Sequence, residues 1–214
     1  MGKQPLPTTA ETGKSREGHE QVAEQWEQQF ASRIDRLAPA EKDLVQTLAV
    51  IGRDFALGLL QRVITKSQDE LNEMLHTLQL AEFIYEQPAT GDIEYTFKHA
   101  LTQEVAYKSL LVERRKVLHE RVGFALEASF ARSIDDHLSE LAHHFARSGN
   151  SEKAVEFLRR AAIQSLRRSA YREASAYLNS AIDLVRAAPE SIARSHSELV
   201  LLNILGQVTS VMSH

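Results

Sequence analysis

Histidine and glutamate side chains at helical spacing are the first candidates for chemistry in this sequence. Glu140, His143 and His144 could meet a metal ion on a helix, since these residue types are common metal ligands. Two adjacent histidines, however, point about 100° apart on a helix, which favours a packing or solvated role. His119-Glu120 matches the start of a zinc-protease motif, but Gly123 stands where the second histidine is required. We therefore expect no metal site.

The motifs of nucleotide and acyl chemistry are missing from the sequence. It contains neither Gly-x-x-x-x-Gly-Lys-Ser/Thr nor Gly-x-Gly-x-x-Gly, the glycine-rich loops that cradle phosphates. No Gly-x-Ser-x-Gly elbow accompanies its serines. The absence of cysteine excludes disulfides, thiolate metal sites and a cysteine nucleophile. We expect a non-enzymatic chain with no catalytic residue and no cofactor.

Clustered basic residues could bind an anionic partner or could simply face solvent. The runs Arg114-Arg115-Lys116, Arg159-Arg160 and Arg167-Arg168 have acidic neighbours such as Glu113 and Glu156, which favours solvated helix faces. Residues 1–95 carry 9 basic and 16 acidic side chains, and residues 96–214 carry 16 and 13. The mildly basic second half is not a nucleic-acid footprint, because the isoelectric point of the chain is about 6.1.

The elements that carry these residues are predicted to be mainly helices. With only 9 glycines and 5 prolines among 214 residues, breakers are rare, and apolar residues recur at helical spacing. Ser67 and Glu70 have the spacing of a capping box, which predicts a helix start. The predicted helices cover residues 22–37, 41–51, 56–64, 68–80, 100–130, 135–147, 151–169, 171–187 and 197–211.

One β-hairpin is predicted among the helices. Residues 83–85 and 93–97 are rich in aromatic and β-branched side chains and flank the turn formers of residues 88–92. Helices followed by a single hairpin indicate a winged helix, with the hairpin as the wing. A DNA-binding transcriptional regulator is the alternative function of such a domain. It is disfavoured because helix 68–80 contains Asp69, Glu70 and Glu73 but no lysine or arginine.

A weak internal repeat marks the second half of the chain. Ala154, Phe157, Leu158 and Ala161 recur twenty positions later as Ala174, Tyr177, Leu178 and Ala181. Small residues at close helix crossings are typical of tetratricopeptide-like arrays, although an ordinary bundle with an alanine-rich seam fits as well. We expect a disordered segment at 1–20, a winged-helix domain with flanking helices at 21–130 and a tetratricopeptide-like helical region at 131–214.

Three segments of the sequence resemble one known family. They are Arg33-Ile34-Asp35-Arg36-Leu37, Ala49-Val50-Ile51-Gly52-Arg53-Asp54-Phe55, and the block from Tyr95 to Tyr107, which reads Tyr-Thr-Phe-Lys-His-Ala-Leu-Thr-Gln-Glu-Val-Ala-Tyr. They look like the region after the ATPase domain in bacterial STAND-type ATPases, many of which are fused to class III adenylate or guanylate cyclases. The resemblance runs from about Ala31 to the C-terminus.

The resemblance implies a regulatory role rather than a catalytic one. In the family it resembles, the order is effector, P-loop ATPase, winged helix and tetratricopeptide-like sensor repeats, and this chain matches only the last two. It implies a signal-relay module that contacts an ATPase domain and a protein or peptide partner. It also implies that His99 contacts the ADP β-phosphate and locks the inactive state; alternatively, His99 caps the following helix or packs under the wing.

The chain is expected to be a cytoplasmic fragment or stand-alone remnant, not inserted in a membrane. The uncharged stretch from Leu199 to Ser213 is shorter than the roughly 18 to 20 residues of a spanning helix. Met1 to Glu20 lacks the apolar core of a signal peptide. Apolar surface at the ends of such a fragment would favour self-association.

Overall fold

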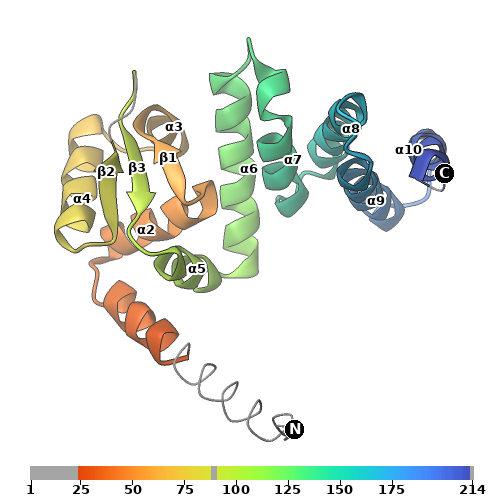
Figure 1. Ribbon diagram of the computed structural model, residues 1–214. Coiled ribbons are helices and arrows are strands. Elements are labelled where there is room, and N and C mark those ends of the chain that lie inside the picture. Colours follow the sequence, from red (N-terminus) through yellow and green to blue (C-terminus); the bar gives the residue numbers. More distant parts are fainter. Residues whose placement is uncertain (1–23, 88–90, 213–214) are drawn as a thin grey trace, which may run out of the picture. The chain divides into compact units, whose positions relative to one another are not determined.

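The computed structural model describes residues 24–87 and 91–212 (Figure 1). The protein is mainly helical, with one small sheet, and divides into two compact units. The first holds the described residues up to Phe55 together with Ser67–Leu110, and the second holds Ala56–Lys66 and the chain from Leu111 onward. Residues 1–20, predicted to be disordered, lie outside the described residues.

The helices of the first unit begin where local chemistry satisfies their free backbone donors. Residues 24–35 are helical, and α2 (Pro39–Ile51) starts with Pro39 in its first turn, where the missing N–H costs nothing. The predicted capping box at α4 (Gln68–Leu80) is confirmed. Ser67 Oγ accepts from the backbone N–H of Glu70 at 3.3 Å, and Glu70 Oε2 accepts from the backbone N–H of Ser67 at 3.1 Å.

The sheet has one strand more than the predicted hairpin. Strands β2 (Ile84–Gln87) and β3 (Glu94–Phe97) pair antiparallel, with Ile84 opposite Phe97 and Gln87 opposite Glu94. The additional strand β1 (Asp54–Ala56) joins the far edge of β3, so the order is β1-β3-β2. Three residues are too few to show the alternation by which a strand is recognised in a sequence.

Aromatic and aliphatic side chains from the sheet and its covering helices form the core of the first unit. The Phe55 ring lies 6.1 Å from the Tyr95 ring and 6.0 Å from the Phe97 ring, between centroids. Helix α5 (Ala100–Lys108) packs against α2 and completes the unit. The buried aliphatic residues include Ile34, Leu44, Val45, Leu48, Leu71, Leu75, Leu78 and Ile84.

The single helix predicted for residues 100–130 is wrong, because two helices occupy this stretch. Helix α5 ends at Lys108, and α6 (Val112–Ser129) begins after an extended Leu111. The hydroxyl of Ser109 donates to the carbonyl of Ala106 at 2.7 Å. It thus takes a backbone acceptor that a continuing helix would use. Apolar spacing runs across this break, so periodicity alone does not reveal it.

The second unit is a succession of helices in which each packs on the next (Figure 1). Short α3 packs against α6, then α6 on α7, α7 on α8, α8 on α9 and α9 on α10. The helices are α3 (Leu57–Val63), α7 (Leu138–Arg147), α8 (Ser151–Arg167), α9 (Tyr171–Ala187) and α10 (Ile192–Met212), with a 3₁₀ turn at Ile134–His137 before α7. The predicted bounds of α9 are confirmed. The chain enters the second unit for good after Leu110, whereas the domain boundary predicted from the sequence lies after residue 130.

Small residues allow two close approaches in this unit. The repeat positions Ala154 and Ala161 of α8 and Ala174 and Ala181 of α9 are all buried, and the two helices pack extensively. Between α6 and α7, a Cβ atom on Gly123 would lie 2.9 Å from the Phe145 ring. None of the described helices is long and apolar enough to cross a lipid bilayer.

Candidate functional site

His99, the residue singled out from the sequence, lies on the surface of the first unit where β3 leads into α5. It occupies the N-cap position of α5 with extended backbone, φ −132° and ψ 131°, but its side chain makes no capping hydrogen bond. His99 is thus the N-cap residue of α5 by position, but its side chain does not satisfy a backbone donor of the helix. Its ring lies 5.7 Å from the Phe30 ring between centroids, and the side chain is exposed.

Glu82 and three basic side chains, Arg33, Lys98 and His99, form what we call the Glu82 cluster. The ammonium of Lys98 donates to Glu82 Oε1 at 2.7 Å. This hydrogen bond and the charge of Lys98 lower the pKa of the Glu82 carboxyl, with smaller contributions in the same direction from Arg33 and His99. The cluster thus gathers three potential cations around a single carboxylate.

The Arg33 guanidinium is held in place by a hydrogen bond and by a cation–π contact. Its Nη2 donates to the carbonyl of Ala81 at 2.8 Å, and its guanidinium lies 5.0 Å from the centroid of the Phe83 ring. Ala81 caps the C-terminus of α4, where unpaired carbonyls favour a cation. The cluster is therefore built on the helix of residues 24–35, the turn between α4 and β2, and the β3–α5 junction.

The segments that carry the family resemblance converge in this unit. The backbone N–H of Phe97 donates to the carbonyl of Arg53 at 3.0 Å, and Gln103 Nε2 donates to the carbonyl of Ala49 at 3.3 Å. Of the four residues of the Glu82 cluster, only His99 is predicted as a site residue from the sequence; Lys98, Glu82 and Arg33 are not. Only the adjacency of Lys98 and His99 in the sequence could have signalled part of the cluster.

The cluster offers anion binding rather than bond-making chemistry. A guanidinium fork, an ammonium and an imidazole can all donate hydrogen bonds to a phosphate or carboxylate oxygen. The carboxylate of Glu82 is already engaged by Lys98. Glu82, Lys98 and His99 are exposed to water, which screens their charges, whereas Arg33 is partly buried.

Among the other residues singled out from the sequence, the rings of His119, His143 and His144 lie together, with centroids 5.1–5.9 Å apart, whereas Glu140 pairs elsewhere. Glu140 Oε2 pairs with His137 Nδ1 at 3.2 Å, whereas His143 Nδ1 lies 3.1 Å from Arg147 Nη1. His144 points inward instead, as adjacent residues on a helix must diverge. Among the residues that the structure describes, no group of three or more side chains is placed to hold a metal ion.

A buried histidine pair joins α6 to α7. His119 Nδ1 and His144 Nδ1 lie 3.0 Å apart and both side chains are buried, so one ring must donate and the other accept. Burial lowers the pKa of His119 to about 4, and the nearby charges of His143, Arg147 and Arg115 act in the same direction. His119, dismissed above as a zinc ligand, is therefore a neutral packing element.

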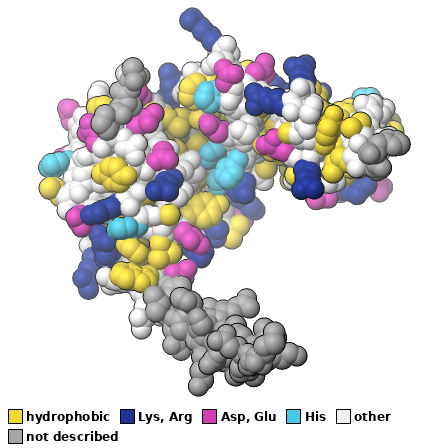
Figure 2. Space-filling model, in the orientation of Figure 1, with side chains coloured by type: hydrophobic (Ala, Val, Ile, Leu, Met, Phe, Trp, Pro, Cys, Tyr) yellow, Lys and Arg dark blue, Asp and Glu magenta, His cyan; other side chains and the backbone are white. Residues whose placement is uncertain are grey.

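Two of the basic runs contain a side chain that is paired with a carboxylate. Lys116 Nζ lies 2.9 Å from Glu113 Oε1, and Arg160 Nη2 lies 2.9 Å from Asp135 Oδ1. Figure 2 shows acidic and basic side chains interspersed on the visible face, without a wide area of one sign. Helix α4 presents Asp69, Glu70 and Glu73 to solvent, which would repel the phosphates of DNA.

Comparison with known proteins gives one relative. Neither a protein-family model nor a solved structure significantly matches the chain. The chain is 30% identical over 178 residues to an uncharacterized protein of Rhizobium meliloti. The match covers 83% of this chain and only 17% of that relative, so the chain spans about a sixth of the relative's length.

Proposed function

We propose that this chain is a non-enzymatic signal-relay module that links a nucleotide-binding switch domain to helices that bind a protein or peptide. The first unit, together with α3, would be a winged helix. The element order α2-β1-α3-α4-β2-β3 and the strand order β1-β3-β2 support this assignment, since two helices lie between β1 and the hairpin that pairs with it. The hairpin β2–β3 would be the wing.

The helices of the second unit would be the start of a tetratricopeptide-like array. Their successive packing, and the buried alanines at the twenty-residue spacing of α8 and α9, support this assignment. The relative that the chain matches is several times longer, which supports a role as one module of a larger protein. We place that protein in the cytoplasm and expect the ATPase domain to be one of its parts.

The observation that carries the proposal is the Glu82 cluster, in which the His99 side chain is exposed. His99, at the β3–α5 junction, would donate to the β-phosphate of ADP held by the neighbouring ATPase domain, and Arg33 and Lys98 would add positive charge. Movement of the winged helix away from that domain would break these contacts. Peptide binding by the repeats would shift the balance between the two states.

An ADP titration of the full-length polypeptide that contains this chain tests the proposal. His99→Ala is expected to weaken ADP binding about tenfold or more, because a hydrogen bond to a charged group contributes about 1.5–3 kcal/mol. His76→Ala, which removes an exposed histidine of α4, is the control and should leave the affinity unchanged. Equal ADP affinity of His99→Ala and the unchanged protein would refute the role of His99.

The DNA-binding alternative has a simple test of its own. Duplex DNA of mixed sequence would bind in a salt-dependent way if the wing or the arginine-rich helices contacted its backbone. The acidic face of α4 leads us to expect no such binding, even at low salt. Salt-dependent binding that Arg167→Ala and Arg168→Ala abolish would favour the regulator.

A further inference from the structure

An open pocket of about 640 Å³ lies between α3 and α6, wholly within the second unit. Its apolar part comes from α6, where Val117 and Phe124 are seven residues apart and so share a helix face. Both are about half exposed, 49% and 45%. The pocket is lined by Arg62, Val117, Glu120, Arg121, Phe124, Ala125 and Ala128.

The apolar floor of the pocket is rigid. The Phe124 ring packs edge-on against the Phe145 ring, with centroids 5.4 Å apart and an interplanar angle of 80°. Phe145 is fully buried and stacks on Phe157 of α8 at 5.3 Å. A ring held in this way loses little entropy when a partner covers its free face, which favours binding there.

Two arginines from different helices lie at the rim of the pocket. Arg62 of α3 and Arg121 of α6 are exposed, and neither side chain makes an ion pair or hydrogen bond with another residue in the described part of the chain. The one carboxylate of the pocket, Glu120, accepts from Asn150 Nδ2 at 3.1 Å. The rim thus has a net positive charge. Elsewhere in the second unit, Arg160 and Arg186 are paired with carboxylates.

We propose that the α3–α6 pocket binds an extended protein segment in which an apolar side chain is flanked by carboxylates. The apolar side chain would cover Phe124 and Val117, and Arg62 and Arg121 would each take a carboxylate in the bidentate geometry that guanidinium groups favour. Arginine and aromatic residues are enriched among the residues that dominate protein interfaces. This site does not depend on the nucleotide contact proposed for His99.

Fluorescence anisotropy with a labelled peptide tests the pocket. The peptide has a central Phe-Leu pair flanked on each side by alternating aspartate and serine, and it is titrated with the full chain. Saturable binding is expected, with a loss of about tenfold or more for the double variant Arg62→Gln/Arg121→Gln and for Phe124→Ala. The loss for the arginine variant should shrink as salt is raised.

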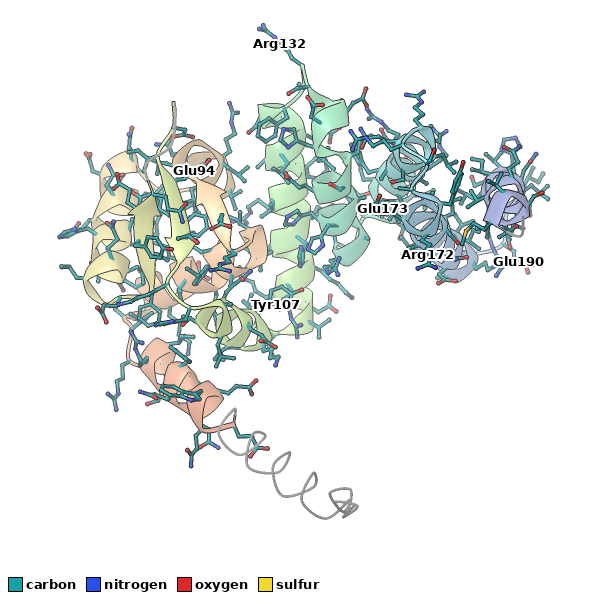
Figure 3. All side chains as sticks on the ribbon, viewed as in Figure 1. Glu94, Tyr107, Arg132, Arg172, Glu173 and Glu190 are labelled. Atoms are coloured by element: carbon teal, nitrogen blue, oxygen red, sulfur yellow. The ribbon has the colours of Figure 1, made fainter. Side chains whose placement is uncertain are left out.

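Arg132→Gln is the matched control for the two arginines. Arg132 extends from the turn between α6 and α7 (Figure 3), outside the pocket, so its replacement should change the affinity by less than about twofold. Thermal unfolding of each variant shows whether it is folded. The arginine variants should shift the midpoint little, whereas Phe124→Ala removes the contact with the Phe145 ring and should lower it.

Any one of the following results would overturn the proposal. They are no saturable binding of the labelled peptide, equal loss of affinity in Arg132→Gln and in the pocket variants, and equal binding of a peptide whose Phe-Leu pair is replaced by serines. Equal binding of the serine-substituted peptide would show that the peptide is attracted by its charge alone. Displacement of the peptide by inorganic phosphate at the same concentration would also count against a protein segment as the occupant.

Discussion

The buried contact between His119 and His144 links the stability of the second unit to pH. His119 is neutral when folded because its pKa is lowered from 6.5 to about 4. In the unfolded chain it takes up a proton near its ordinary pKa. Between these two values the unfolded state binds more protons, so stability is complete above about pH 6.5 and falls as the pH drops toward 4.

We predict that His119→Gln reduces this loss. Urea unfolding at about pH 7 and about pH 4.5 should show that His119 accounts for a decrease of the order of 2–3 kcal/mol in the unchanged protein, since one pKa unit corresponds to about 1.4 kcal/mol. The variant should be less stable than the unchanged protein at neutral pH, because a buried hydrogen bond is disturbed, but should lose less on acidification.

His196→Gln is the control for this experiment. His196 is an exposed histidine of α10, so the control should show the same decrease with pH as the unchanged protein. If His119→Gln lost as much stability on acidification as the control, protonation of His119 would not be the cause.

At the residue scale, the sequence contained only part of the candidate site. The Lys98-His99 pair is visible because it is contiguous. Arg33 and Glu82, by contrast, reach it through the end of α4 and the turn into β2. Their local sequence does not indicate that they lie near Lys98 and His99, because this proximity depends on tertiary packing. The same holds for the α3–α6 pocket, where Arg62 and Arg121 are far apart in the sequence.

At the scale of elements, two helices end with a side chain in a backbone conformation that suits glycine. Glu82 after α4 and Ser169 after α8 both have φ 58°. At α8, the N–H of Ala170 donates to the carbonyl of Ser165 and the N–H of Ser169 to that of Leu166, the hydrogen bonds of a Schellman motif. This left-handed conformation costs an ordinary residue about 1–2 kcal/mol.

Ser169→Gly is therefore predicted to stabilise the protein. The gain should be about 0.5–1 kcal/mol, because relief of the left-handed strain exceeds the entropy that glycine loses on folding. The exposed Ser169 side chain makes no hydrogen bond in the described structure, so little else changes. Urea unfolding measures the difference.

Ala176→Gly, in the neighbouring helix α9, is the control and is expected to destabilise the protein. Ala176 is exposed within α9, where glycine costs about 1 kcal/mol relative to alanine. A loss of stability in both variants would mean that the end of α8 does not impose the conformation described here.

The elements themselves were largely predictable, and the exceptions have physical causes. The capping box at Ser67 and the apolar repeat of α9 are local signals, and both gave correct helix starts. Strand β1 is too short for a pattern and is defined by its hydrogen bonds to β3. The break between α5 and α6 interrupts the backbone at Ser109 without interrupting the apolar spacing.

At the scale of the whole molecule, the two units should lose their structure separately. Leu141 of α7 and Leu75 of α4 are both fully buried, one in each unit. Replacing either by alanine should cost about 2–5 kcal/mol in its own unit. Hydrogen exchange followed by mass spectrometry should show faster exchange in that unit and little change in the other.

Exchange of the α3 amides tests to which unit this helix belongs. Because α3 belongs to the second unit, its amides should exchange faster in Leu141→Ala and stay protected in Leu75→Ala. The reverse pattern would show that α3 is stabilised by its sequence neighbour α4 and not by α6. Order along the chain places α3 within the predicted winged helix, but it carries no information on which unit a short helix packs against.

The chain passes between the two units three times, after Phe55, after Lys66 and after Leu110. A protease that cuts one peptide bond therefore cannot release either unit as a complete piece. Removal of everything after Leu110 leaves α3 without its packing partner α6, with its buried apolar side chains newly in water. A shortened protein that retains the first unit should consequently be prone to aggregate unless residues 56–66 are replaced by a short polar loop.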